Sequence, residues 1–297
     1  MKYLVIGASG FVGSNLLRHV RESGYEAMGT QSSAREGGLV TFDLLNDRLT
    51  DRVPRAFFER GEKVCVIVAA VVSDMDRCLL EREKSHRINV VNTIRLIEDI
   101  AVLGAKPVFI SSNFVFDGVK GDYTEDDPVL PANEYGRHKA EVEAHLTQHV
   151  PQAFIARFDK IVGHGPQEKH LLANWYRELV AGRPLVALRG SLLAPTYVKD
   201  VARALVFAAE RDLRGIHHVA NSEFFYREEL ALQFSRALGR EAEVISRSVE
   251  EFNFPDKRAL KSNLVGSRFA ALAKMRFTPM RDVFLRFRQE IENGTSA

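Results

Sequence analysis

A glycine-rich turn between an apolar run and an amphipathic stretch constrains this chain more than any other feature. The apolar run at residues 2–6 predicts a short buried strand, and Gly7-Ala-Ser-Gly10-Phe-Val-Gly13 follows it and opens a stretch with helical spacing. Gly7 permits a tight turn, Gly10 lets the backbone approach a pyrophosphate, and Gly13 lets the helix pack closely on the strand. The N–H groups that begin the helix would then face the phosphates of a dinucleotide. The pattern predicts cofactor contacts at Gly7, Ser9, Gly10, Phe11, Val12 and Gly13.

Strand-like and helix-like segments alternate through the first half of the chain. Further strands are predicted at residues 25–29, 64–70, 106–112 and 153–158, and helical patterns at 76–103 and 135–150. Because strands that alternate with helices pair in parallel, we predict an α/β fold with a doubly wound parallel sheet of the Rossmann type. The carboxyl ends of its strands would lie along one edge.

The alternation weakens in the second half. A chain of 297 residues is long enough for one large domain or two of ordinary size. After residue 160, helical patterns at 171–181, 198–211, 227–238 and 281–291 are separated by short strands. We therefore predict a dinucleotide-binding domain over residues 1–160, with segments near 195–220 returning to it, and a smaller, mostly helical substrate lobe over 161–297.

The composition of the chain limits the classes of partner that it is expected to bind. The chain has 41 Lys and Arg against 39 Asp and Glu, and a net charge of +2 gives no overall attraction to nucleic acid or to an anionic membrane. Cys65 and Cys78 form no disulfide framework and lack zinc-ligand spacing, so we expect reduced thiols and no metal. The longest apolar stretch near the start, residues 3–6, is too short for a signal peptide or a membrane span, and a cytoplasmic protein is expected.

The residues after the second predicted strand indicate which dinucleotide is preferred. A carboxylate at this point binds the ribose 2′-hydroxyl and favours NAD, whereas an arginine accommodates a 2′-phosphate. Residues 29–35 contain no carboxylate, and Glu36 is the first that follows. Ser32 and Arg35 would suit a phosphate. We therefore expect NADP(H), with NAD(H) as the alternative.

Tyr135 and Lys139 stand four residues apart, which places a phenol and an ammonium on one face of a helix. A lysine beside a tyrosine favours the phenolate and lowers the tyrosine pKa from about 10, so that the phenol can act as an acid and base near neutrality. Ser111 and Ser112 end a predicted strand, at the sheet edge where ligands bind in open α/β folds. A serine hydroxyl that binds a substrate carbonyl would complete the site.

With these motifs the chain resembles the extended short-chain dehydrogenases/reductases, the NAD-dependent epimerase/dehydratase superfamily, over nearly its whole length. This family acts largely on nucleotide sugars. Three stretches are similar to those of dTDP-4-dehydrorhamnose reductases: Ser111-Ser-Asn-Phe-Val-Phe-Asp-Gly118, Ala194-Pro-Thr196 with Asp200, and Arg258-Ala-Leu-Lys-Ser262.

The resemblance implies roles for individual residues. Tyr135 would give its proton to the developing alkoxide, Ser112 would hold the same oxygen, and Lys139 would bind the nicotinamide ribose. Further cofactor contacts would come from Asp43, Leu44, Ala69, Ala70, Val71, Asn89 and Ser111. The substrate contacts would be Ser112, Asn113, Phe114, Thr196 and Arg258. The family also implies a homodimer.

The loop after Ser111 and Ser112 indicates which of the family's reactions the chain catalyses. Nucleotide-sugar 4,6-dehydratases carry an acid pair there, whereas Asn113 and Phe114 transfer no proton at neutral pH. The resemblance therefore favours NADP(H)-dependent reduction of a 4-keto-6-deoxy nucleotide sugar to the 4-hydroxy sugar. Two alternatives stay open: a nucleotide-sugar epimerase, and a non-catalytic protein like the regulatory subunit of methionine adenosyltransferase.

Three positions depart from the reductase pattern and favour a sugar other than the rhamnose precursor. Asn113 stands where Asp is usual, Arg157-Phe-Asp-Lys160 replaces a stretch with Thr and an aromatic residue after the Arg, and Ala259 replaces Pro. Arg189 and Arg258 are candidate ligands of the nucleotide diphosphate, because planar guanidinium groups suit phosphate.

Overall fold

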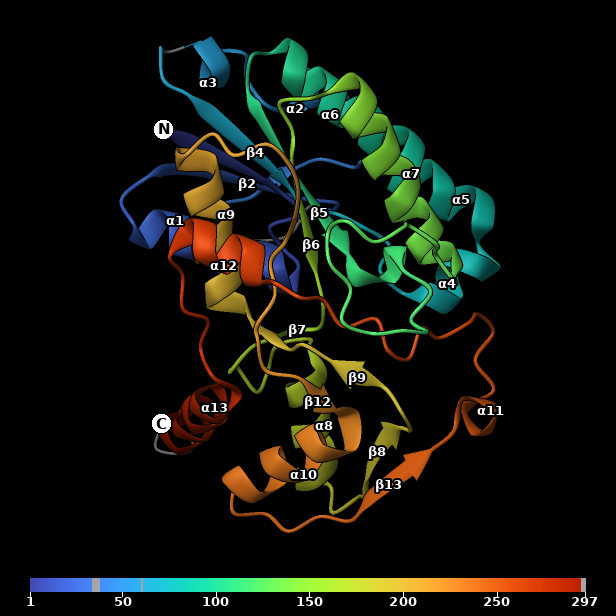
Figure 1. Cartoon of the computed structure of the whole chain (residues 1–297). Helices are drawn as coiled ribbons and strands as arrows, with labels where there is room; N and C mark the ends of the chain where they lie inside the picture. Colours follow the sequence, from blue (N-terminus) through green and yellow to red (C-terminus); the bar gives the residue numbers. More distant parts are fainter. Residues whose placement is uncertain (34–37, 60, 295–297) are drawn as a thin grey trace.

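A parallel sheet with strand order β11-β6-β5-β4-β1-β2-β3 organises the first lobe of the molecule (Figure 1). The computed structural model describes residues 1–33, 38–59 and 61–294. The order reverses direction between β1 and β4, which makes this a doubly wound sheet, as predicted. Its strands are β1 (Lys2–Ile6), β2 (Glu26–Gln31), β3 (Val40–Thr41), β4 (Val64–Val68), β5 (Lys106–Ser112), β6 (Phe154–Phe158) and β11 (Gly215–His218).

Helices cover both faces of the sheet, which explains why its strands are apolar throughout. Because side chains alternate along a strand, Tyr3 and Val5 of β1 pack with α1 (Phe11–Glu22) and α9 (Val198–Glu210). Leu4 and Ile6 face the opposite way, toward α6 (Thr93–Val102) and α7 (Glu134–His149). The shorter helices of this lobe are α2 (Leu49–Arg52), α3 (Ala56–Glu59) and α12 (Ser267–Ala273).

The helix predicted over residues 76–103 is interrupted in the structure. It consists of α4 (Met75–Leu80), α5 (Arg82–His86), a π-helical segment (Arg87–Asn92) and α6. Asn89 lies in the π-helical segment and bonds the backbone of Val72 twice: its Oδ1 accepts from the Val72 N–H at 2.8 Å, and its Nδ2 donates to the Val72 carbonyl at 2.9 Å. Such segments are frequent at functional sites, and this one anchors the chain that leaves β4.

In the described residues, the second lobe combines three longer helices and one short helix with three short strand pairs (Figure 1). Its core gathers Trp175, Phe234, Phe284 and Phe287. The helices are α8 (Leu171–Val180), α10 (Arg227–Ala237) and α13 (Met280–Gly294), with the short α11 (Val249–Phe252). The pairs are β7 (Ile161–Val162) with β10 (Thr196–Tyr197), β9 (Leu192–Leu193) with β12 (Phe225–Tyr226), and β8 (Leu185–Leu188) with β13 (Val244–Arg247).

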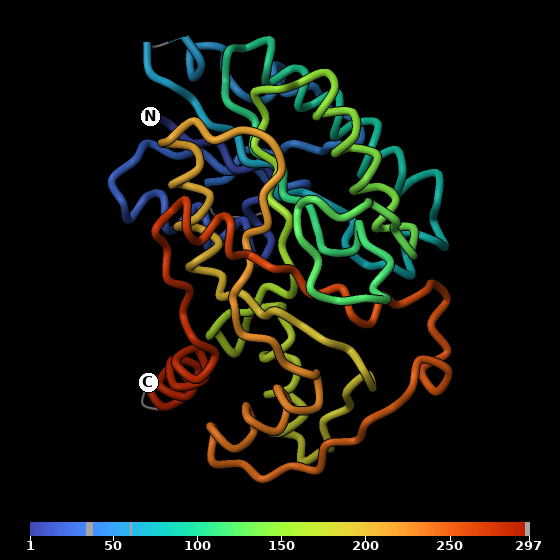
Figure 2. Tube along the Cα trace, viewed as in Figure 1, coloured from blue at the N-terminus to red at the C-terminus, as the bar shows by residue number. Residues whose placement is uncertain are grey.

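The chain passes between the lobes more than once. It leaves the sheet after β6, returns with α9 and β11, and leaves again, and the division at residue 160 stays our proposal. Figure 2 shows the stretch that precedes α12, in orange to red, crossing from the second lobe to the first. Within it the Leu260 carbonyl accepts from the Leu192 N–H at 2.8 Å, and the Lys261 N–H donates to the Gly118 carbonyl at 2.9 Å. These bonds tie both lobes together at the carboxyl edge of the sheet.

None of the helices within the described ranges has the length and apolar character needed to span a bilayer.

Candidate functional site

The glycine turn after β1 is packed as the sequence pattern predicts. A Cβ atom on Gly7, whose φ is +86°, would lie 2.8 Å from the Ala70 nitrogen, and one on Gly13 would lie 2.2 Å from the Gly7 carbonyl oxygen. Helix α1 therefore sits directly on the turn, and the turn sits on the end of β4. Ser9 and Gly10 are exposed, and no described side chain caps the start of α1. Its N–H groups are available to phosphate oxygens, so this cradle fits a dinucleotide.

The other predicted cofactor residues lie around the same end of the sheet with distinct local roles. Ala69 continues the β4 backbone by donating its N–H to the Ile6 carbonyl at 2.9 Å. The Asp43 carboxylate accepts from the Leu45 N–H at 3.0 Å and shapes the turn after β3, and Leu44 is buried in the core. Ser32 is exposed at the end of β2. Arg35, the predicted ligand of a 2′-phosphate, lies outside the described residues.

Tyr135, Lys139 and Ser112 are brought together at the carboxyl end of β5. Helix α7 begins after Asn133, whose side-chain oxygen accepts from the Gly136 N–H at 2.8 Å. Its first turn rests on the loop after β5, so that the Tyr135 phenol lies close enough to the Ser112 hydroxyl to interact with it. The Lys139 ammonium lies 5.7 Å from the centroid of the Tyr135 ring and donates to the Ile110 carbonyl at 2.7 Å.

Burial dominates the electrostatics of this trio, and here the structure differs from the prediction that Lys139 lowers the Tyr135 pKa. Burial raises the pKa of Tyr135, Cys78 adds to the rise, and the interaction with Ser112 opposes it. Burial also lowers the pKa of Lys139 to about 7, against the opposing charges of Glu143 and Cys78. The ammonium is thus held near its titration point, where its charge depends on what binds beside it.

A polar row extends from Ser112 into the second lobe. The Ser112 hydroxyl lies 3.1 Å from Asn113 Oδ1, and Asn113 Nδ2 donates to Asp159 Oδ1 at 3.2 Å and to Ser262 Oγ at 2.8 Å. Asp159 Oδ2 also accepts from the Ala194 N–H at 2.8 Å. Burial raises the pKa of Asp159 to about 6, and its backbone N–H donors oppose the rise. Asn113 therefore joins three segments beside the proposed catalytic hydroxyl.

The remaining predicted substrate residues are engaged to different degrees. Phe114 is half-buried, with its ring edge-on to Tyr135 at 6.2 Å between centroids. The Thr196 hydroxyl is buried and bonds the Ala194 carbonyl at 3.2 Å and the Asn221 N–H at 3.1 Å. The Arg258 guanidinium donates to Asp76 Oδ2 at 2.6 Å and lies 3.9 Å from the centroid of the Phe254 ring. A contact from Arg258 to substrate stays a prediction.

The sequence model described as the RmlD substrate binding domain matches residues 1–292. The chain belongs to this family. It is a family of oxidoreductases like dTDP-4-dehydrorhamnose reductase, which confirms the resemblance drawn from the motifs.

Three curated relatives illustrate the kinds of protein to which this chain is similar. The spore coat polysaccharide biosynthesis protein SpsK of Bacillus subtilis is 28% identical over 84% of this chain and 84% of the relative. A dTDP-4-dehydrorhamnose reductase of Mycolicibacterium smegmatis is 25% identical over 100% of this chain and 85% of its own length. The methionine adenosyltransferase 2 subunit beta of Danio rerio is 25% identical over 80% of this chain and 73% of the relative.

Solved structures share the fold of the family member. A hypothetical dTDP-4-dehydrorhamnose reductase from Sulfolobus tokodaii superimposes with a TM-score of 0.82 at 29% identity, covering 95% of this chain and 98% of that one. The dTDP-4-dehydrorhamnose reductase of Bacillus anthracis, solved in complex with NADP, has a TM-score of 0.85 at 21% identity, covering 97% and 99%. The predicted Rossmann fold is confirmed.

A buried ionic network behind the site was not predicted from the sequence. Arg157 Nη2 donates to Glu143 Oε2 at 2.6 Å, and both side chains are almost fully buried. Glu143 Oε1 also accepts from the Ser111 hydroxyl at 2.5 Å, and Arg157 Nη1 lies 3.3 Å from His218 Nε2 on β11. The predicted cofactor residue Ser111 is thus bonded within the protein, and Glu143 lies one turn after Lys139 on α7.

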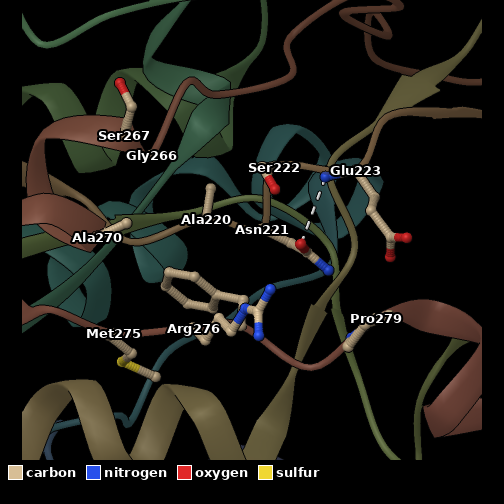
Figure 3. Close-up of a pocket in the computed structure, with 11 residues that line it drawn as sticks. Ala220, Asn221, Ser222, Glu223, Gly266, Ser267, Ala270, Met275, Arg276 and Pro279 are labelled. Atoms are coloured by element: carbon tan, nitrogen blue, oxygen red, sulfur yellow. Dashed lines mark hydrogen bonds between the residues drawn. The ribbon is translucent and has the colours of Figure 1, made fainter.

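A hollow of about 280 Å³ lies between the loop after β11, the start of α12 and the segment before α13, and its lining residue Asn221 bonds the Thr196 hydroxyl. Figure 3 shows Ala220, Asn221, Gly266 and Arg276 among its lining residues, with the Glu223 N–H donating to Asn221 Oδ1 at 3.3 Å. Asn221 Nδ2 also bonds the Pro195 and Thr278 carbonyls. These bonds give Asn221 a structural role in holding the loops around the hollow.

Proposed function

We propose that this protein reduces a 4-keto-6-deoxy nucleotide sugar to the 4-hydroxy sugar with NADP(H), with NAD(H) as the alternative cofactor. The observation that carries the proposal is the docking of α7 on the loop after β5, which sets Tyr135 beside Ser112 and Lys139. Membership of a reductase-like family supports it, because that family supplies relatives that are nucleotide-sugar reductases. The glycine cradle next to β4 supports the cofactor.

The dinucleotide would lie across the ends of β1 and β4. Its pyrophosphate would meet the N–H groups of the glycine turn, at residues 7–13, and its ribose and nicotinamide would follow the segment at residues 69–71. The Bacillus anthracis neighbour, which is in complex with NADP, supports this choice of cofactor. When bound, the nicotinamide supplies the hydride that reduces the keto carbon.

The chain's own residues would then supply the proton and stabilise the negative charge that forms on the substrate oxygen. Tyr135 would hold a proton at its phenol oxygen and release it to the alkoxide that forms on the substrate. The Ser112 hydroxyl would donate a hydrogen bond to that same oxygen and orient it toward the phenol. The Lys139 ammonium, 5.7 Å from the Tyr135 ring, would stabilise the phenolate left behind and bind the nicotinamide ribose.

The surroundings of Asn113 favour reduction over elimination of water. Elimination needs both a general acid and a general base at the sugar, whereas the Asn113 amide transfers no proton and is bonded to Asp159 and Ser262. Phe114 beside it is apolar. Reduction needs no group beyond the three proposed, so this loop suits it.

The test is oxidation of NADPH, followed by its absorbance, on adding a panel of 4-keto-6-deoxy sugars linked to dTDP, UDP and GDP. Turnover of one of them is the expected result, and the product identifies the sugar and its stereochemistry. Absence of turnover throughout the panel would overturn the proposal. The same panel run with NADH measures the preference between the two cofactors.

A second candidate is a non-catalytic subunit, which the similarity to the methionine adenosyltransferase 2 subunit beta supports. It predicts a stable complex with a methionine adenosyltransferase catalytic subunit and no turnover in the panel. Size-exclusion chromatography of the mixed proteins separates the two candidates, since the reductase needs no such partner.

A further inference from the structure

Two cationic side chains lie half-buried in the second lobe without a neutralising partner. Lys160 follows β6, and Arg227 is the first residue of α10. Within the described ranges neither side chain forms an ion pair, and the Arg227 Nε is buried without a hydrogen-bond partner. A buried cation without a partner costs free energy, so such a pair is retained where a ligand can satisfy it.

The backbones of Lys160 and Arg227 both bond one segment, residues 191–196. The Lys160 carbonyl accepts from the Thr196 N–H at 2.9 Å, and the Arg227 N–H donates to the Ser191 carbonyl at 2.9 Å. Figure 1 shows β7, β9 and β12 together between the sheet and helix α10. Burial lowers the pKa of Lys160 to about 8, and the charge of Arg227 adds to the fall. The two residues therefore bond opposite ends of one segment, near enough for their charges to interact.

Two carboxylates adjoin the cations in the sequence, and neither forms an ion pair with them. Asp159 accepts hydrogen bonds from Asn113, from the Ala194 N–H and from the Lys160 N–H at 2.6 Å. Glu228 Oε1 accepts from the Ser246 hydroxyl at 2.8 Å, whereas Glu228 Oε2, like Arg227 Nε, is buried without a hydrogen-bond partner. Both lower the local positive charge without forming an ion pair with either cation. The site keeps donors for an incoming anion.

This pair lies on the substrate side of the reaction centre. Lys160 adjoins Asp159, which bonds Asn113, and Asn113 Oδ1 lies 3.1 Å from the Ser112 hydroxyl. The two arginines suggested by the sequence for a diphosphate are less suited to it. Arg258 pairs with Asp76, and the largely exposed Arg189 donates to the Ser246 carbonyl at 2.8 Å.

We propose that Lys160 and Arg227 together bind an anionic oxygen group of the nucleotide-sugar substrate. This inference rests on the proposed function and deepens it by naming what holds the acidic part of the ligand. A guanidinium offers paired donors and an ammonium a compact charge, a combination that suits phosphate or carboxylate. The anion is either the diphosphate, common to all such substrates, or a carboxylate on the sugar.

Isothermal calorimetry on Lys160→Gln and Arg227→Gln tests the pair, with Arg183→Gln, an exposed arginine of the same lobe paired with Glu178, as the matched control. The ligands are dTDP and UDP against thymidine and uridine, and UDP-glucuronate against UDP-glucose. If the diphosphate occupies the pair, each variant loses about ten- to hundredfold in affinity for dTDP or UDP, while the control keeps wild-type affinity. If a sugar carboxylate occupies it, the loss is confined to UDP-glucuronate.

Wild-type affinity of both variants for every one of these ligands would overturn the inference, and so would a wild-type protein that binds none of them. If a Gln variant unfolds, the charge-conserving variants Lys160→Arg and Arg227→Lys take its place in the measurement. They should retain most of the affinity for the anionic ligands. Calorimetry needs no turnover. Pair-dependent binding without reduction would therefore overturn the proposed function alone, whereas reduction with an unchanged KM in both Gln variants would overturn only the inference.

Discussion

A Cβ atom on Gly136 would come within 2.0 Å of the carbonyl oxygen of Phe114. The first turn of α7 therefore lies in direct backbone contact with the loop that follows β5. This contact sets the position of Tyr135, which precedes Gly136, relative to Ser112 at the end of β5. The placement of Tyr135 beside Ser112 therefore requires a residue without a side chain at position 136.

Gly136→Ala should lower both activity and stability, because the methyl group meets backbone atoms that cannot rotate away. We expect a loss of about 1–3 kcal/mol in the free energy of unfolding and a fall in kcat/KM. Chemical denaturation and the NADPH assay measure the two effects. Gly294→Ala is the control, since a Cβ there meets nothing within 4 Å, and it should leave kcat/KM as in the wild type. An equal effect of both substitutions would contradict the role given to this contact.

Tyr135→Phe and Ser112→Ala should reduce turnover by about 10²–10⁴-fold, the range of a single acid–base group, while binding of NADPH is retained. The reason is that both groups would act on the substrate oxygen. Steady-state kinetics measure turnover, and fluorescence titration measures the affinity for NADPH. Tyr25→Phe is a control, because its hydroxyl bonds Glu210 outside the site. Full activity of Tyr135→Phe would refute the assignment.

Local rules account for what could be predicted from the sequence. Glycine is required at positions 7 and 13 because a Cβ atom there would meet Ala70 and the Gly7 carbonyl oxygen. The spacing of the glycines in the sequence is enough to predict this turn. Tyr135 and Lys139 share a helix face for the same reason. Both predictions use residues that are close in sequence and whose backbone geometry is regular.

Contacts that depend on the register of the sheet could not be predicted in this way. Ser111 and Arg157 are register partners on β5 and β6, and only that pairing brings Arg157 to Glu143 on α7. The interruption near Asn89 was missed because hydrophobic spacing continues through it. Lys160 belongs to residues 157–160, a stretch that departs from the reductase pattern in sequence. Its proximity to Arg227 depends on the strand pairs of the second lobe, which the sequence does not reveal.

Removing one partner of the buried Glu143–Arg157 pair should destabilise the protein strongly. Arg157→Met leaves the Glu143 carboxylate buried without its guanidinium, and we expect a loss of about 3–5 kcal/mol in the free energy of unfolding. The double substitution Glu143→Leu with Arg157→Met should recover much of that loss, since no charge remains unpaired. Arg183→Met, which breaks an exposed ion pair with Glu178, should leave the free energy of unfolding almost unchanged. A small loss in Arg157→Met would show that water reaches the pair.

The buried ammonium of Lys139 should make stability depend on pH. Its pKa falls from 10.5 to about 7 on folding, so between these values the unfolded chain binds more protons than the folded protein. The free energy of unfolding therefore rises with pH across this window, by at most about 1.4 kcal/mol per pH unit from this group, and below pH 7 the full penalty is present.

Lys139→Met removes that contribution. The variant's free energy of unfolding should be less steep between pH 7 and 9.5 than that of the wild type, and its advantage should be greatest at pH 7, where the ammonium is most costly. Urea denaturation at several pH values measures the difference, with the exposed Lys169→Met as the control. Turnover should be lost in Lys139→Met at every pH. Parallel pH profiles for the wild type and Lys139→Met would mean that the ammonium keeps its water, and a loss of turnover would then report its contact with the cofactor and not its burial.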